Sequence, residues 1–111
     1  MIPKLLVAGE LNVDLLLNNI QAFPQIGKEI IADEMNMCLG SSSAIMAANS
    51  AAMGVDTTFC GVVGADYFGD FILGELEKKS VSCRHVTRLK GYKTGCTLIL
   101  NYGQDRANVT F

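Results

Sequence analysis

Apolar and polar positions along the chain fall into blocks that predict alternating strands and helices. Leu5–Ala8 and Thr57–Val63 are short, continuous apolar runs, which are typical of strands buried on both faces of a parallel sheet. Between them, an alanine-rich segment from Ala44 to Gly54 predicts a helix, because serines precede it as candidate N-caps and a glycine follows its last turn. These three segments predict a strand–helix–strand unit.

A second helix is predicted between Asp66, its expected N-cap, and Lys79. Four apolar side chains recur at helical spacing and form one stripe, which we expect to face the core: Phe68, Phe71, Ile72 and Leu76. Asp70 near the start and the lysines at the end suit the helix dipole.

The remaining segments predict shorter strands. Lys28–Asp33 and Met35–Leu39 are too short and polar for a core sheet, so we expect them to form a flap or hairpin outside the main fold. Three more strands are predicted at Val86–Leu89, Gly95–Tyr102 and Arg106–Phe111, separated by glycine-containing turns.

The order of these elements indicates an α/β fold with a parallel sheet, because two parallel strand pairs would be joined through helical crossovers. The last strand-like run stops at Phe111 without a cap or a turn. That is an odd place for a natural domain to end, so we expect residues 1–111 to be an incomplete domain.

Composition narrows the function classes. The 111 residues are half hydrophobic and only 18% charged, with a net charge of −2, which excludes extended disorder and gives no basic surface for nucleic acid. The four cysteines have no metal-ligand spacing, and we expect buried, reduced thiols. No apolar stretch approaches the ~20 residues that span a bilayer, and no targeting segment precedes the first strand, so we predict a cytoplasmic protein.

Candidate chemistry begins where the first strand ends. Asn12 and Asp14 follow Leu5–Ala8, and the carboxyl ends of parallel strands are where ligands bind in open α/β sheets. Two residues apart in an extended backbone, both side chains point to the same side and could hold neighbouring hydroxyls. The alternative is that Asp14 caps a turn while Asn12 satisfies a loop.

The start of the alanine-rich helix is a second candidate. Gly40, Ser41 and Ser42 place free backbone N–H groups and hydroxyls where they could bind a polar ligand, although serine also caps helices without any ligand.

Several motifs, taken in order, resemble the N-terminal part of the ribokinase/PfkB family of carbohydrate kinases. They are Gly9–Leu15 after the first strand, Pro24–Glu29 before the flap, Gly40 with Gly54 around the helix, Phe59–Gly69, and Thr94-Gly95. Each motif alone is weak, but five in this order and at this spacing are specific, and together they cover essentially the whole chain.

The resemblance implies a role for each matching residue. In such kinases the residue matching Asp14 binds sugar hydroxyls with help from the position of Asn12, and the turn matching Gly40, Ser41 and Ser42 contacts the substrate. Lid strands, here expected around 28–39 and 86–111, cover the site and pair between subunits in a homodimer. The family usually has a glycine at position 41 and an asparagine at position 45, where this chain has serine and isoleucine, so the resemblance does not single out ribose.

The resemblance also implies ATP and Mg²⁺ as cofactors and a sugar or nucleoside as substrate. The family's G-A-G-D signature, which carries the catalytic base, and its ATP-binding segments match nothing here. Gly64-Ala65-Asp66 is similar in sequence to that signature, but it belongs to the earlier strand–helix turn. No catalytic or metal-binding residue is therefore predicted before Phe111, and the 111-residue chain alone is expected to transfer no phosphate.

Two other readings remain. A stand-alone module could bind a polyol, or dimerise through its flap, without catalysis. A dinucleotide-binding oxidoreductase is disfavoured, because no G-x-G-x-x-G follows the first strand.

Overall fold

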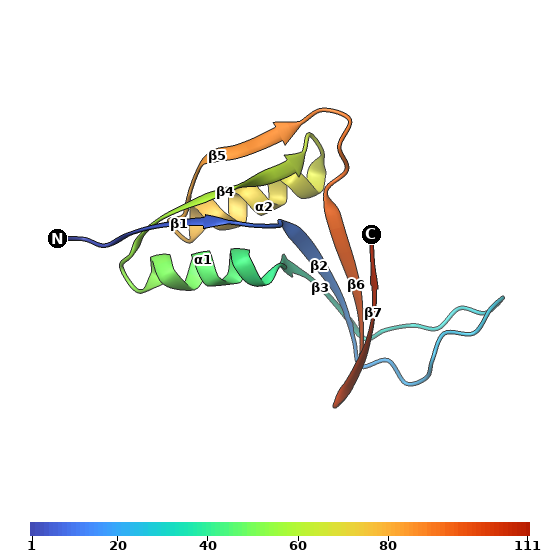
Figure 1. Ribbon diagram of the computed structural model, residues 1–111. Coiled ribbons are helices and arrows are strands. Elements are labelled where there is room, and N and C mark those ends of the chain that lie inside the picture. The colour runs from blue at the N-terminus through green and yellow to red at the C-terminus, as the bar shows by residue number, and fades with distance from the viewer.

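The computed structural model describes residues 1–111 and contains two sheets and two helices (Figure 1). One sheet has three strands in the order β1-β4-β5, and the other has four in the order β3-β2-β6-β7. In chain order the elements are β1 (Lys4–Ala8), β2 (Asn12–Asn18), β3 (Glu34–Leu39), α1 (Ser42–Ala52), β4 (Asp56–Gly64), α2 (Tyr67–Lys78), β5 (Ser82–Leu89), β6 (Gly95–Tyr102) and β7 (Asp105–Thr110).

The three-stranded sheet is parallel throughout, as the sequence predicts. Both helices lie against the same face of this sheet (Figure 1). The core between the helices and the sheet contains Phe59 and Val63 from β4, Val7 from β1, and Ile72 and Leu76 from α2. The opposite face carries exposed apolar side chains, since Leu6 is 63% exposed and Val62 is 40% exposed.

Local sequence accounts for both helices. Ser41 caps α1, and the buried side chains of this helix are alanines, which allow it to lie close to the sheet. Asp66 caps α2 by accepting a hydrogen bond from Gly69 N. The predicted apolar stripe of α2 faces the core: Ile72 and Leu76 are fully buried, and Phe68 and Phe71 pack beside them.

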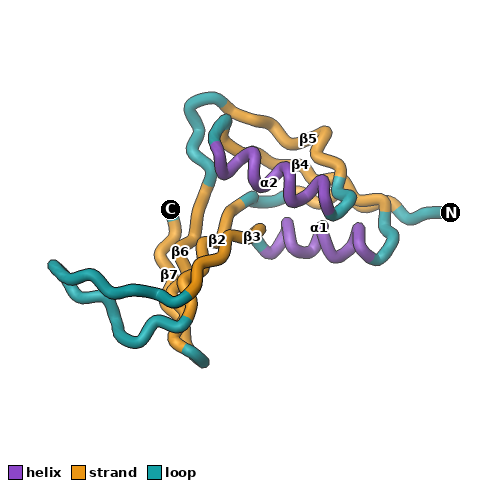
Figure 2. Tube along the Cα trace, turned by 180° about the vertical axis from the view of Figure 1, so that it is seen from behind, coloured by secondary structure: helices purple, strands orange, loops and turns teal.

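The four-stranded sheet leaves the main body at an angle, and Figure 2 shows its strands side by side from behind. β2 pairs in parallel with β6, while β3 and β7 flank them as antiparallel edge strands. β2 follows β1 almost directly, so the chain passes from one sheet to the other across residues 9–11.

The four-stranded sheet has one apolar face and one polar face. The apolar face carries every second cross-strand pair, beginning with Val13↔Leu39 and Leu15↔Leu98. Two cross-strand rows make up most of this apolar face: Met37, Leu15, Leu98 and Val109, then Met35, Leu17, Leu100 and Ala107. The polar face carries Asp14, Thr97 and Thr110 in one row, and Asn18, Asn101 and Arg106 in another.

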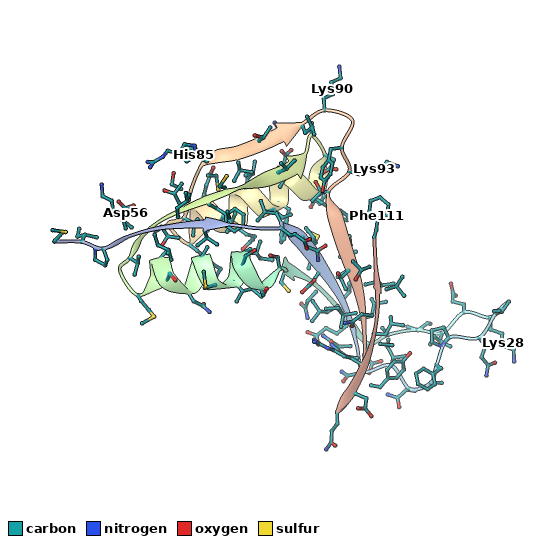
Figure 3. The ribbon with its side chains drawn as sticks, in the orientation of Figure 1. Lys28, Asp56, His85, Lys90, Lys93 and Phe111 are labelled. Carbon is teal, nitrogen blue, oxygen red and sulfur yellow. The ribbon has the colours of Figure 1, made fainter.

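The predicted strand at Lys28–Asp33 is wrong. Residues 19–33 form a loop without strand structure, and Lys28 lies far out on it (Figure 3). The pairing of β2 with β3 ends at Asn18↔Glu34, so the residues before Glu34 have no neighbouring strand. A β-branched sequence alone does not form a strand without a hydrogen-bonding partner.

Two further expectations need correction. Val86–Leu89 does not belong with the four-stranded sheet, because it forms the carboxyl half of β5 and pairs in parallel with β4 in the three-stranded sheet. The α2 crossover returns the chain to the main sheet before it turns into β6. The cysteines are not buried either: Cys38 and Cys60 are exposed, and Cys83 and Cys96 are half-buried. Neither helix is both long enough and apolar enough to cross a lipid bilayer.

Candidate functional site

A polar cleft of about 320 Å³ lies where the two sheets meet, at the carboxyl end of β1. Its lining comes from the turn after β1, from the start of α1 and from the polar face of the four-stranded sheet: Glu10, Asn12, Asp14, Ser41, Thr97, Ile99, Arg106, Asn108 and Thr110. The cleft therefore contains three of the predicted site residues. His85, the only histidine, lies near the start of β5, away from the cleft (Figure 3).

Asn12 and Asp14 are held as a pair on β2. The Asn12 Nδ2 group lies 3.1 Å from Asp14 Oδ1 and 3.1 Å from Thr97 Oγ1, so it can donate to both. Both side chains are half-buried, and β2 keeps them on one side of its backbone, as their spacing predicts. A carboxylate oriented by an amide in this way retains free lone pairs for hydroxyl donors.

Gly40 is buried directly against this pair. Its N–H donates to Asn12 O at 2.8 Å. A β-carbon built on Gly40 would lie 2.5 Å from Asp14 Oδ1 and 3.0 Å from Asn12 Nδ2. Position 40 therefore accommodates glycine because any side chain would displace the Asp14 carboxylate.

Ser41 joins the start of α1 to the turn after β1. Its Oγ donates to Glu10 O at 2.6 Å and accepts from Ala44 N at 3.4 Å. Its backbone adopts φ 72° and ψ 126°, a conformation that glycine tolerates and other residues rarely adopt. Ser43 donates to the same Glu10 carbonyl at 3.1 Å.

The other candidates near this helix lie outside the cleft lining. Ser42 begins α1 with an exposed side chain and does not line the cleft. Ile45 is 45% exposed and instead lines a groove with Cys38 and Asn49. Of the residues predicted at the site, the structure thus brings together Asn12, Asp14 and Ser41 in the lining, with Gly40 behind them.

Sequence reasoning missed the contribution of β6 and β7. Thr97 lies beside Asp14 through the β2–β6 register, and Thr110 lies beside Thr97 through the β6–β7 register, where their hydroxyls are 3.0 Å apart. The signal was present in β7, where Arg106, Asn108 and Thr110 alternate with apolar residues. Period-two alternation places such polar residues on one face.

The charge of Asp14 affects two neighbouring thiols. Burial, and secondarily the Asp14 charge, raises the pKa of Cys96. Cys38 is exposed as a residue, but partial desolvation of its thiol, followed by the charges of Asp14 and Glu75, raises its pKa in the same direction. Both thiols stay protonated near neutral pH and act as weak polar groups, not as nucleophiles.

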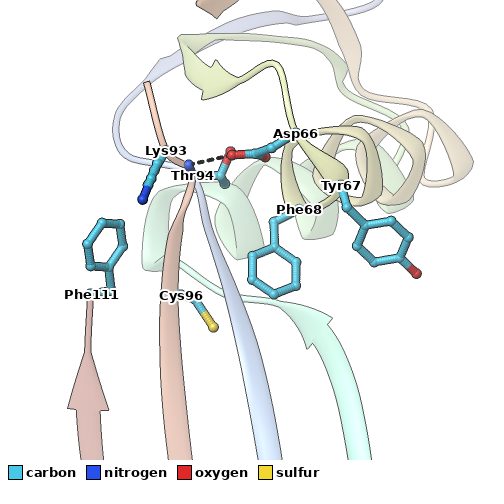
Figure 4. Close-up of a pocket in the computed structure, with 7 residues that line it drawn as sticks. All are labelled: Asp66, Tyr67, Phe68, Lys93, Thr94, Cys96 and Phe111. Carbon is cyan, nitrogen blue, oxygen red and sulfur yellow. Dashed lines mark hydrogen bonds between the residues drawn. The ribbon is translucent and has the colours of Figure 1, made fainter. Parts of the chain in front are cut away.

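A larger cleft of about 620 Å³ lies on the other face of β6, next to the start of α2. Figure 4 shows its lining, which is mostly apolar and includes Phe68, Cys96 and Phe111. Its one carboxylate belongs to Asp66, whose oxygens are already used: Oδ1 accepts from Gly69 N and Thr94 Oγ1, and Oδ2 accepts from Thr94 N at 2.9 Å. The larger cleft therefore offers fewer free polar groups than the smaller one.

Asp66 serves as a structural clamp between the β4–α2 turn and the segment entering β6. Hydrogen bonds from the Thr94 backbone, then from the Thr94 hydroxyl and Gly69 N, lower the pKa of this carboxyl, with Arg88 adding to the effect. Partial burial opposes the shift. Thr94 is itself buried and accepts from Gly64 N at 2.8 Å, so the clamp fixes where β6 begins.

The parallel sheet with its two helices, joined to a second sheet, places this chain among the α/β proteins. The polar cleft lies at the carboxyl end of β1, and in open α/β sheets ligands bind at the carboxyl ends of the strands. Residues 3–111 match the model of the pfkB family of carbohydrate kinases, and the chain belongs to that family. The fold is the ribokinase-like α/β fold, as the sequence predicts.

Individual relatives agree with this assignment. Ribokinase of Staphylococcus aureus (strain COL) is 29% identical over 100 residues, a match covering 89% of this chain and 33% of the relative. The structure of Arabidopsis thaliana ribokinase complexed with ribose and ATP has a TM-score of 0.89 at 25% identity, covering 100% of this chain and 36% of that one. Fructokinase with bound ATP from Xylella fastidiosa has a TM-score of 0.79 at 25% identity, with 100% and 33% covered. The chain thus spans about a third of the length of these relatives.

Proposed function

We propose that the Asn12–Asp14 cleft binds the hydroxyl groups of a sugar or nucleoside. The observation that carries this proposal is the position of the Asp14 carboxylate, held by Asn12 and pressed against Gly40 within a polar cleft. An ionised carboxylate accepts charge-assisted hydrogen bonds from two neighbouring hydroxyls, and these bonds are about twice as strong as neutral ones. Thr97 and Thr110 offer further hydroxyl partners in the same row.

The proposed activity of the whole protein is that of a carbohydrate kinase, which transfers the ATP γ-phosphate to a substrate hydroxyl. In that reaction this cleft binds the acceptor substrate. Family membership supports ATP as the phosphate donor, and we propose Mg²⁺ beside it. No three His, Cys, Asp or Glu side chains of this chain converge as a metal site would require, so we assign no residue here to Mg²⁺ or to the ATP phosphates. The role of residues 1–111 is substrate binding.

Gly40, Ser41 and Ser42 contribute in different ways to this proposed site. Gly40 leaves room for Asp14, and Ser41 positions the turn that carries Glu10 and lines the cleft. Ser42 has an exposed hydroxyl at the start of α1, where it would contact a substrate larger than the cleft itself.

The four-stranded sheet is proposed to act as a lid and as a homodimer interface, as the family resemblance implies. Its polar face lines the sugar cleft, whereas the apolar face leaves Met35 68% exposed and Val109 65% exposed. Covering this face with the same face of a second copy would remove apolar surface from water, at roughly 25 cal/mol per Å². A self-complementary patch is what a two-fold dimer requires.

The sugar site is tested by calorimetric titration of the protein with neutral sugars, comparing wild type with Asp14→Asn. The isosteric variant keeps the shape of the side chain but removes its charge, so hydroxyl binding should weaken while thermal unfolding changes little. If Asp14 only completes a turn, the variant would bind sugar as tightly as wild type, and the proposed site would be wrong.

A further inference from the structure

Arg106 is a cationic side chain within the otherwise acidic and neutral cleft. It lies on β7 and lines the same cleft as Glu10 and Asp14. Neither of these carboxylates pairs with it, because the two ion pairs of the protein join Lys78 to Glu75 and Arg88 to Asp70. The guanidinium therefore keeps its five donors free for a ligand.

Strand register places Arg106 at the opposite end of the cleft from the acidic groups. Asp14, Thr97 and Thr110 form one cross-strand row, and Arg106 lies four residues along β7 from Thr110. At about 3.3 Å per residue, the two rows are roughly 13 Å apart along the sheet, and the arginine's own length shortens the gap. Between them lie Ile99 and Asn108, paired in register.

The cleft consequently has an electrostatic direction. Glu10 and Asp14 make one end negative and suited to hydroxyl donors, while Arg106 makes the other end positive. A guanidinium binds carboxylate and phosphate oxygens through paired, parallel hydrogen bonds. A ligand with hydroxyls at one end and an anionic group at the other fits this polarity, and the reverse orientation would bring like charges together.

We propose that Arg106 is a specificity-determining residue that selects an anionic sugar, either a sugar acid or a sugar phosphate, over a neutral one. This inference rests on the proposed sugar site, because it uses Asp14 to fix the hydroxyl end of the ligand. Arg106 binds the charged group at the far end and thereby sets the orientation of the sugar.

The test is calorimetric titration of the protein with three probes: D-fructose as the neutral sugar, D-gluconate as the carboxylate and D-fructose 6-phosphate as the phosphate. Each is titrated into wild type, Arg106→Gln, Asp14→Asn and the control Arg84→Gln. Arg84 is an exposed arginine on β5 outside the cleft, so its replacement removes the same charge elsewhere. Thermal unfolding of each variant is recorded alongside.

We expect at least one anionic probe to bind about tenfold more tightly than fructose, or tighter still, because a hydrogen bond to a charged group raises affinity by about that factor. Arg106→Gln should abolish this preference, while Arg84→Gln should preserve it. Whichever anionic probe loses affinity identifies the carboxylate or the phosphate as the group bound. Equal loss in both arginine variants, or no preference in wild type, would overturn the role of Arg106 while leaving the sugar site intact. Binding of no probe, or binding unaffected by Asp14→Asn, would instead overturn the sugar site.

Discussion

The Asp14 carboxylate occupies the space that a β-carbon at Gly40 would take, since that carbon would lie 2.5 Å from Asp14 Oδ1. Gly40→Ala should therefore rotate Asp14 away from Asn12, because the end of a short side chain moves more easily than the backbone. We expect sugar affinity to fall about tenfold or more, through loss of a charge-assisted bond. Calorimetric titration measures this change.

Gly74→Ala is the matched control for that substitution. A β-carbon at Gly74 meets nothing within 4 Å, and this glycine lies inside α2. The change should stabilise the protein by about 0.5–1 kcal/mol through helix propensity and leave sugar binding unaltered. If both alanine variants bind sugar like wild type, Gly40 does not protect the position of Asp14.

Removing the carboxylate altogether should have a larger effect. Asp14→Ala loses two charge-assisted hydrogen bonds to sugar hydroxyls, each contributing about 1.5–3 kcal/mol. Sugar affinity should fall about a hundredfold or more. A lowered melting temperature with unchanged sugar affinity would show that Asp14 is only a structural residue, and a melting curve beside the titration distinguishes the two results.

Asp66 should matter for stability and not for ligand chemistry. In Asp66→Asn one oxygen becomes an NH₂ group, which cannot accept from Thr94 N. We expect a loss of about 1–3 kcal/mol in the free energy of unfolding, measured by urea denaturation. Asp70→Asn removes an exposed ion pair to Arg88 and a charge near the start of α2, and should cost about 1 kcal/mol or less. Similar losses in the two variants would argue against the clamp.

The same carboxyl group predicts how stability depends on acid. Its folded-state pKa is lowered, chiefly by the Thr94 backbone hydrogen bond, below the ordinary value of about 3.9. The stabilisation is therefore complete above that value and is lost as the pH falls toward and through the folded-state pKa. Urea denaturation from pH 6 downward should show wild type losing its advantage over Asp66→Asn only below about pH 4. An advantage that persists unchanged at lower pH would contradict this assignment.

The apolar face of the four-stranded sheet gives a prediction about assembly. Val109→Lys places a charge on β7, an edge strand of that face, where an unpaired charge in an interface is strongly unfavourable. We expect wild type to sediment as a dimer and the variant as a monomer at the same concentration. Thr87→Lys, on an exposed position of β5, should remain dimeric. A monomeric wild type at high micromolar concentration would remove the basis for the lid interface.

The helices were predictable because their signals are local. Ser41 and Asp66 act as caps, and the α2 stripe recurs at helical spacing, so neighbouring residues decide the outcome. The strand at Gly95–Tyr102 was predicted with its observed bounds for a similar reason, since glycine-containing turns delimit it.

The errors came from features that depend on distant residues. Whether Lys28–Asp33 forms a strand depends on a partner, and β2 ends before it can supply one. Whether Thr97 and Arg106 join Asp14 depends on the registers of β2 with β6 and of β6 with β7, which no single segment encodes. Asn12, Asp14 and Gly40 of the candidate site could therefore be predicted from the sequence, whereas the residues from β6 and β7 are placed beside them only by strand pairing.

The two faces of the four-stranded sheet make strand register a condition for the proposed sugar site. Side chains alternate along β2, so a slip of this strand by one residue would turn Leu15 into the cleft and Asp14 onto the apolar face. The hydrophobic pattern opposes a slip by one residue, but a slip by two would leave each set of side chains on its own face. The polar bonds Asn12–Thr97 and Asn18–Asn101, the latter at 2.6 Å, are satisfied in one offset only. These two bonds fix the register of β2 against β6. A single-residue insertion in β6 between Thr97 and Asn101 would bring one of them out of register.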